Sequence, residues 1–178
     1  MKQAVLVIDV QQGLCEGEGA AYDCAGTISR INELTRRARL ASAPVIFVQH
    51  ESDSGYLTYG TREWQLADGL QVRDSDIRLR KTTPDAFHGT ELQAVLGRLT
   101  IDELIICGMH SEFCVDTSTR RALALGLPVI LVSDGHTSAG NQAISARQVI
   151  EHENLTLTAI SSFGPRARAL TGEQIHFV

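Results

Sequence analysis

The sequence predicts a three-layer α/β fold, with a doubly wound, mainly parallel six-stranded sheet and helices on both faces. Short apolar runs rich in β-branched residues recur along the chain without polar alternation, which is typical of parallel strands covered on both faces. Segments with helical spacing separate these runs, as in doubly wound sheets. No repeat, linker or low-complexity segment interrupts the 178 residues, so we expect one domain over 1–178.

The first two predicted strands flank a helix. The run AVLVID at 4–9 is apolar and β-branched until its final aspartate, as expected of a buried strand. Residues 26–42 carry their apolar side chains mainly on one helical face, and Pro44 ends that helix. The run VIFV at 45–48 then predicts the second strand.

The pattern breaks down from 49 to about 76. This stretch holds Tyr56, Tyr59 and Trp64, three of the nine aromatic residues of the chain. So long a loop in a compact domain is usually a lid or a binding segment. The three side chains are as consistent with contact to a substrate as with packing of the loop. Together with Phe113, we take them as candidate substrate-binding residues.

The remaining elements follow from the same signals. Strands are expected at 77–80, 103–107, 129–132 and 155–160, and helices at 90–99, 114–125 and 142–152, followed by a short helix and a tail. Gly126 and Pro128 follow the helix at 114–125 in the order expected of stop signals.

Charge, hydropathy and cysteine content exclude several classes of protein. A formal net charge of −5 argues against nucleic-acid binding, which needs a clustered basic face. No segment approaches the roughly 18 apolar residues of a membrane span, and the N-terminal run lacks the cleavage site of a signal peptide. The four cysteines form no CxxC pair, and free thiols are the default for such a chain in a reducing compartment. We therefore expect a cytoplasmic protein with no membrane or nucleic-acid partner.

Reactive side chains follow the predicted strands at their carboxyl ends, where open parallel sheets bind ligands. Asp9 ends the first strand, Lys81 follows the third, and Cys114 lies at the start of the helix after the fourth. The positive end of that helix and a neighbouring lysine would lower the pKa of the thiol and favour the thiolate. An aspartate could carry the proton, and free N–H groups at the helix start could hold an oxyanion. The alternative is a structural cysteine, for which Cys107, inside an apolar strand, is the better candidate.

Five segments resemble the isochorismatase-like cysteine hydrolases, a family that includes nicotinamidases and N-carbamoylsarcosine amidases. The segments are VLVIDVQQGL at 5–14, VIFVQH at 45–50, RKTTPDAFHGTEL at 80–92, LIICGMHSEFCVDTSTRRALALG at 104–126 and VILVSDGHTS at 129–138. The match runs nearly end to end, and GMHSEFCVDTSTR is highly specific within it. The resemblance implies the Rossmann-type fold of that family.

By this resemblance Asp9, Lys81 and Cys114 form a catalytic triad. Asp9 would take the thiol proton and return it to the leaving group, while Lys81 would hold both groups and tune their pKa values. The family has a cis peptide bond at the position of Met109–His110, which would turn the His110 N–H toward the site to form an oxyanion hole with the Cys114 N–H. The implied reaction is attack by Cys114 on an amide or carbamoyl carbonyl, loss of ammonia or an amine, and hydrolysis of the thioester.

One departure from the family concerns metal binding. Nicotinamidases carry an Asp-x-His pair and a further histidine after the second strand, whereas VQHESDSGYLTYG here has only His50. We therefore expect no metal, no other cofactor, and a substrate other than nicotinamide. His88 and His136 are expected to be hydrogen-bonding residues of the rim rather than ligands.

Other functions remain open at this point. Family members that hydrolyse an ether can lack the cysteine, so Cys114 favours C–N hydrolysis over ether hydrolysis. A thiol-based redox protein on this fold requires a resolving cysteine near Cys114. A nucleotide-binding module requires a glycine-rich phosphate-binding loop after the first strand. A Schiff base on Lys81 would leave Cys114 unexplained. The family implies a small-molecule substrate and a homo-oligomer, often a dimer or tetramer.

Overall fold

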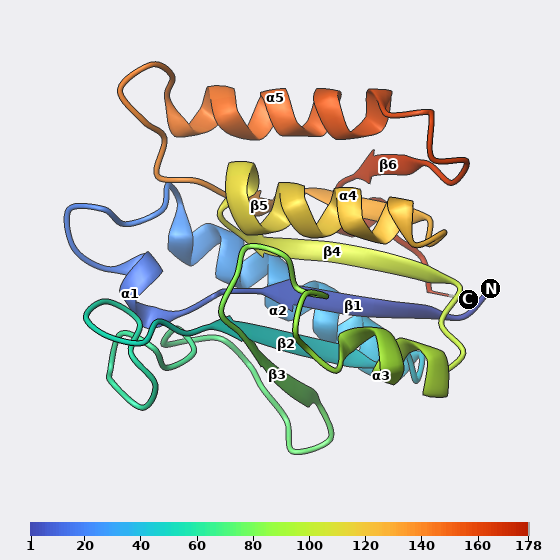
Figure 1. The fold of residues 1–178 in the computed structure, drawn as a ribbon, viewed down its shortest axis with the longest axis horizontal. Coiled ribbons are helices and arrows are strands. Elements are labelled where there is room, and N and C mark those ends of the chain that lie inside the picture. Colours follow the sequence, from blue (N-terminus) through green and yellow to red (C-terminus); the bar gives the residue numbers. More distant parts are fainter. Residues whose placement is uncertain (178) are drawn as a thin grey trace.

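The computed structural model describes residues 1–177 and contains a six-stranded sheet in the order β3-β2-β1-β4-β5-β6 (Figure 1). All five strand pairs are parallel, which confirms the predicted doubly wound fold. The strands are β1 (Gln3–Ile8), β2 (Val45–His50), β3 (Ile77–Lys81), β4 (Glu103–Met109), β5 (Val129–Thr137) and β6 (Ala167–Leu170). The helices are α1 (Gln12–Cys15), α2 (Cys24–Leu40), α3 (Leu92–Arg98), the π-helical turn η1 (Ser111–Val115), α4 (Asp116–Ala124), α5 (Ala146–Ala159) and the 3₁₀ turn η2 (Gly172–Gln174).

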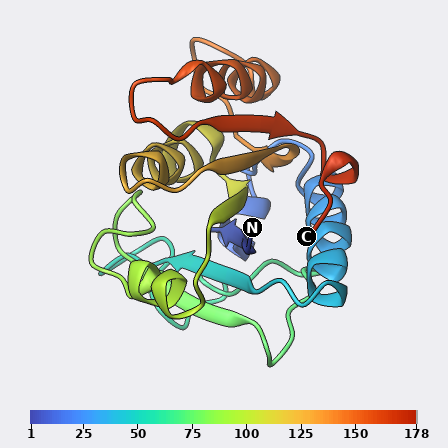
Figure 2. The same cartoon turned by 90° about the vertical axis from the view of Figure 1, so that its right-hand side faces the viewer.

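Helices cover both faces of the sheet, with α2 on one side and α3 and α4 on the other (Figure 2). Successive residues of β1 point to opposite faces. Val5 and Val7 pack in the cluster that contains the apolar face of α2, whereas Leu6 and Ile8 pack with residues from α3, α4 and α5. Because both faces of the strand are buried, its sequence is apolar throughout, and this explains the missing alternation.

The strand order reverses at the centre of the sheet, between the neighbouring strands β1 and β4. Strands β1 to β3 are laid down toward one edge and β4 to β6 toward the other. Ligands of open α/β sheets bind beyond the carboxyl ends of the strands at such a switch point. In Figure 1 these ends lie at the left, beside α1 and the first part of the long loop after β2.

The sixth strand was predicted in the wrong place. Residues 155–160 lie almost entirely in α5 rather than in a strand, and the helix expected at 142–152 begins later and runs to Ala159. Ser145 and Gln148 form a capping box that starts the helix, and Val149, Glu153 and Leu157 form its buried face at four-residue spacing. The tertiary contacts of that face override the β-branched composition of LTLTAI.

The true sixth strand, β6, pairs only with β5 and forms one edge of the sheet. Its sequence ARAL contains an exposed arginine, so it lacks the apolar run by which the central strands were recognised. The residues that follow it form η2 instead of a longer helix. None of the helices within residues 1–177 has both the length and the apolar character needed to cross a membrane.

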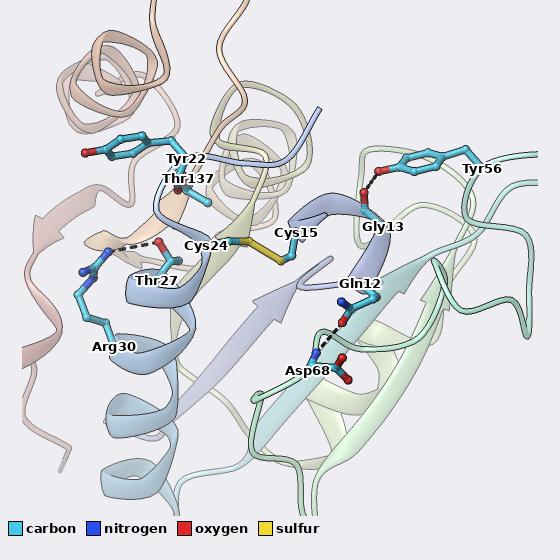
Figure 3. Close-up of a disulfide and its surroundings, with 10 residues drawn as sticks. All are labelled: Gln12, Gly13, Cys15, Tyr22, Cys24, Thr27, Arg30, Tyr56, Asp68 and Thr137. Carbon is cyan, nitrogen blue, oxygen red and sulfur yellow. Dashed lines mark hydrogen bonds between the residues drawn. A yellow bond between two sulfur atoms is a disulfide. The ribbon is translucent and has the colours of Figure 1, made fainter. Parts of the chain in front are cut away.

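Two of the four cysteines are joined in a disulfide, which corrects the expectation that all are free thiols. Cys15 ends α1 and Cys24 begins α2, with their Cα atoms 5.7 Å apart (Figure 3). The loop between them folds back on α1, where the Ala21 N–H donates to the Leu14 carbonyl at 2.9 Å. No spacing signature marks this pair, because the fold of the loop brings the two residues together. Cys107 and Cys114 are free.

We expect Cys24→Ser to lower the free energy of unfolding by about 2–3 kcal/mol, because the disulfide closes a short loop and restricts the unfolded chain. Urea denaturation under non-reducing conditions measures this change. A phosphine reductant should lower the stability of the wild type by a similar amount and leave the variant unchanged. Equal stability of the two proteins, unaffected by reductant, would show that the two thiols are not bonded in solution.

Candidate active site

Three elements of the rim bring Asp9, Lys81 and Cys114 together. Asp9 directly follows β1 and has a positive φ of 50°, Lys81 is the last residue of β3, and Cys114 lies in η1 after β4. Gly108 lies just before this turn, and a Cβ there would collide with the backbone of Ile8 in β1. The absence of a side chain at Gly108 therefore allows β4 to approach β1 closely where the reactive groups meet.

A buried ion pair joins two of these groups. The Lys81 ammonium donates to Asp9 Oδ2 at 2.6 Å, and the two side chains are 0% and 1% exposed. The second carboxylate oxygen, Asp9 Oδ1, is buried and has no hydrogen-bond partner among residues 1–177. A buried oxygen without a donor is costly and is a common feature of functional sites. One oxygen of Asp9 is thus held by lysine while the other can accept a proton.

The ammonium group also contacts three further atoms. Lys81 Nζ lies 3.2 Å from Cys114 Sγ, 3.1 Å from the Thr83 carbonyl oxygen and 3.3 Å from His50 Nδ1. An ammonium has three N–H donors and no acceptor, so all of its donors are engaged within the protein. In its contact with Lys81, His50 Nδ1 serves as the acceptor. Lys81 therefore links the carboxylate, the thiol and the imidazole.

The Cys114 thiol is protonated at neutral pH, contrary to the thiolate expected from the sequence. Burial and the Asp9 carboxylate raise the pKa of Cys114 to about 12, although Lys81 opposes this rise. The expected helix N-terminus is also different, because Cys114 lies in the π-helical turn and α4 begins two residues later. Attack by Cys114 consequently requires a base that removes the proton, and Asp9 is adjacent.

We expect the rate of Cys114 alkylation by iodoacetamide to rise about tenfold per pH unit from pH 7 to pH 10, because only the thiolate reacts. The high pKa of Cys114 places the plateau above this range. Peptide mass spectrometry of the wild type measures the rate, with Cys114→Ala reporting reaction at the fully buried Cys107. A plateau below pH 8 would mean that the thiolate is already present near neutrality.

A pocket of about 230 Å³ opens onto Cys114. Its polar lining consists of the reactive Asp9 and Cys114 and the imidazoles of His50 and His110. The apolar lining is Leu14, Leu57, Pro84, Met109 and Phe113. Leu14 comes from α1, and Leu57 and Pro84 come from two separate loops. Sequence reasoning missed all three because no motif marks such a leucine or proline as a wall of a pocket. The peptide bond between Met109 and His110 is cis.

Of the four candidate substrate-binding residues, only Phe113 lines this pocket, and its side chain is 57% exposed. Tyr59 packs edge-on against Trp64 with ring centroids 4.7 Å apart, and the Arg80 guanidinium lies over the Tyr59 ring, 4.6 Å from its centroid. The Tyr56 hydroxyl donates to the Gly13 carbonyl (Figure 3). These three aromatic side chains therefore pack the long loop through contacts with one another, with Gly13 and with Arg80.

His136 and His88 differ in their surroundings. His136 is buried, and its Nδ1 lies 2.7 Å from Ser111 Oγ while its Nε2 lies 3.1 Å from Asn154 Oδ1. Burial lowers the pKa of His136, so the imidazole is neutral and links β5 and α5 to the turn that carries Cys114. This agrees with the hydrogen-bonding role expected from the sequence. His88 is exposed on the loop after β3.

Asp9, His50 and Cys114 also form a set of possible metal ligands, with one donor atom from each lying within 4.8 Å of the others. A carboxylate, an imidazole and a thiolate suit Zn²⁺. Lys81 Nζ, however, already contacts all three side chains, so the ammonium supplies the positive charge that a metal ion would bring. The expectation that the chain uses no metal remains a prediction.

Comparisons with known proteins place this chain among hydrolases. The family model for the isochorismatase domain matches residues 3–160. A streptothricin hydrolase of Streptomyces noursei is 36% identical over 137 residues, covering 76% of this chain and 50% of that protein, so the chain spans about half the length of this relative. A ureidoacrylate amidohydrolase of Rhizobium rhizogenes is 26% identical, over 84% of this chain and 76% of that protein. A crystal structure of an isochorismatase family protein superposes with a TM-score of 0.86 at 31% identity, over 95% of this chain and 98% of that one.

Proposed function

This chain belongs to the isochorismatase family of hydrolases, and on that premise we propose that it hydrolyses the C–N bond of a small amide or carbamoyl compound with Cys114 as the nucleophile. The observation that carries the proposal is the position of the Lys81 ammonium, 2.6 Å from Asp9 Oδ2 and 3.2 Å from Cys114 Sγ. A thiol beside a base can act as the nucleophile of an acyl transfer, and a cation in contact with both can stabilise the charge that moves between them.

In the first step, the free Asp9 Oδ1 accepts the thiol proton as Sγ attacks the substrate carbonyl. Because burial raises the pKa of Cys114, this transfer takes place as the substrate binds and not in the resting enzyme. The Lys81 ammonium stays between the two groups and stabilises the negative charge as it moves from carboxylate to sulfur.

The negative charge then moves to the carbonyl oxygen of the tetrahedral intermediate. We assign the backbone N–H groups of His110 and Cys114 as its hydrogen-bond donors, since both residues line the pocket beside Sγ. Asp9 returns the proton to the leaving nitrogen, ammonia or an amine departs, and a thioester remains on Cys114. Asp9 then takes a proton from water, the resulting hydroxide hydrolyses the thioester and releases the acid, and the proton passes from Asp9 to Sγ to restore the thiol.

The redox alternative finds little support in the fold. The only other free thiol in residues 1–177 is that of Cys107, which is buried in β4. Cys107 packs in the cluster on the α2 face of the sheet, whereas Cys114 packs against the cluster on the opposite face. The two sulfur atoms are therefore separated by the sheet, and Cys107 is not placed to resolve an oxidised Cys114.

We further propose that residues 1–178 act as one domain within a homo-oligomer. The cytoplasmic location stays a prediction, and the cysteine content no longer supports it, because Cys15 and Cys24 form a disulfide.

The proposed reaction is tested by measuring the products released from a panel of small primary amides and N-carbamoyl compounds. We expect at least one compound to be hydrolysed without added metal or cofactor, and in the presence of a chelator. An amide should give ammonia and carboxylic acid in equal amounts, and an N-carbamoyl compound should give ammonia, CO₂ and the amine in equal amounts. If no amide or carbamoyl compound is hydrolysed while an enol ether substrate is, the C–N assignment is wrong and the ether alternative replaces it.

A further inference from the structure

We propose that the substrate places an uncharged, apolar group in the pocket, so that the enzyme acts on neutral amides and discriminates against amides that carry a carboxylate near the reacting carbonyl. This inference rests on the proposed amidase function and names the substrate class of the same site. It is based on the charged and polar groups that would surround a substrate bound in the pocket.

The pocket walls beyond the reactive groups are apolar. Leu14 lies at the end of α1, Leu57 in the long loop, Pro84 after β3 and Phe113 in η1, and together with Met109 they surround the space in front of Cys114. No arginine and no lysine is among the residues that line this pocket. Apolar walls bind an apolar substituent and offer no compensation for the lost hydration of a carboxylate.

Lys81, the cation closest to the pocket, has no hydrogen-bond donor left for a substrate. Its three N–H groups are engaged by Asp9 Oδ2, Cys114 Sγ and the Thr83 carbonyl, and His50 Nδ1 lies within 3.3 Å as a fourth acceptor. Its charge is balanced by Asp9, from which it is separated by only 2.6 Å. The Lys81–Asp9 ion pair has no net charge, so it offers no net attraction to a carboxylate of the substrate.

The two histidines of the pocket are neutral at physiological pH. Burial and the neighbouring Lys81 ammonium lower the pKa of His50, and burial lowers the pKa of His110. His50 Nδ1 faces the Lys81 ammonium as an acceptor, so this imidazole can only donate to a substrate, through Nε2, whereas His110 can donate one hydrogen bond or accept one. Neither imidazole supplies a positive charge. The pocket can thus satisfy a neutral polar atom of the substrate, such as the amide nitrogen, without binding an anion.

The nearby arginines are also engaged elsewhere. Arg80 pairs with Glu51 and lies over the Tyr59 ring, and Arg62 pairs with Glu16 and Asp68. Neither side chain lines the pocket. A substrate carboxylate would find no unpaired cation in the pocket to offset its lost hydration, and this desolvation would weaken its binding.

A pair of amides with the same chain and nearly the same shape tests the inference. In 4-methylpentanamide an isopropyl group stands where succinamate carries its carboxylate, and both contain the same primary amide. We expect kcat/KM for ammonia release to be at least about tenfold higher for 4-methylpentanamide, because like charges and unpaired buried charges are the usual means of rejecting a ligand. Protection of Cys114 against iodoacetamide measures binding of both compounds independently of turnover.

The outcomes separate this inference from the proposed function. Preferential protection by 4-methylpentanamide supports the inference, even if no ammonia is released, in which case the proposed amidase function fails alone. Equal or better hydrolysis or protection with succinamate overturns the inference and leaves the amidase function standing. Absence of protection by both compounds also counts against the inference, since a neutral amide should enter the pocket.

A charge introduced at the mouth of the pocket provides a second test. Phe113 lines the pocket and is 57% exposed, so Phe113→Arg should be tolerated by the fold. We expect it to shift the ratio of kcat/KM for the two amides by at least about fivefold toward succinamate. Phe163→Arg is the matched control, because Phe163 is 46% exposed and lies in the loop between α5 and β6. An unchanged preference in Phe113→Arg would mean that charge at this pocket does not select the substrate.

Discussion

Replacing Cys114 by alanine is expected to lower kcat for amide hydrolysis by at least about 10⁴-fold, because the proposed reaction has no other nucleophile. Cys114 is only partly buried, and its Sγ accepts a hydrogen bond from Lys81. The free energy of unfolding should therefore change by no more than about 1 kcal/mol. Initial rates of ammonia release and urea denaturation of the same preparations measure the two effects.

Cys107→Ala is the matched control for this substitution. Cys107 is the second free thiol, and it is fully buried in β4, away from the pocket. We expect this variant to lose stability through a small core cavity and to keep its kcat. If Cys114→Ala kept substantial activity while Cys107→Ala lost it, the nucleophile would be wrongly assigned.

Lys81→Met is expected to remove activity and to destabilise the protein by about 3–5 kcal/mol, because it leaves the buried Asp9 without its ion-pair partner. The loss of kcat should be at least about 10³-fold, since the ammonium also contacts Cys114 Sγ and stabilises the charge that develops during attack. Chemical denaturation and steady-state kinetics measure both effects.

The double variant Asp9→Asn/Lys81→Met separates stability from catalysis. With both charges removed, most of the lost stability should return, because the cost of Lys81→Met comes mainly from the unpaired carboxylate. Activity should remain absent, since the double variant has no base. Recovery of activity together with stability would mean that the ion pair serves folding alone.

The central part of the fold could be predicted from the sequence because its parallel strands are buried on both faces. β1, β2 and β4 are continuous apolar runs, and the residues beyond their carboxyl ends are brought together by the topology of the sheet. This is why Asp9 and Cys114 could be grouped before the structure was known, and Lys81 joined them because it follows the short strand expected at 77–80. Strand β6 escaped prediction because an edge strand with an exposed Arg168 lacks that apolar signal.

The electrostatics and walls of the site could not be predicted in the same way. The pKa of Cys114 depends on its burial and on its distance from Asp9, and neither is encoded in local sequence. The pocket walls include Leu14 of α1 and the loop residues Leu57 and Pro84, which only the tertiary fold brings together. The concentration of aromatic residues in the long loop made them candidates for substrate binding, yet Tyr59 and Trp64 pack against each other.

The measurement that tests the central claim most directly is peptide mass spectrometry of the enzyme after rapid acid quench during turnover of an amide substrate. We predict that the peptide containing Cys114 gains the mass of the substrate acyl group, and that hydroxylamine removes this group, as expected of a thioester. An unmodified Cys114 throughout continuing turnover, or a hydroxylamine-resistant acyl group on Lys81, would contradict nucleophilic catalysis by Cys114.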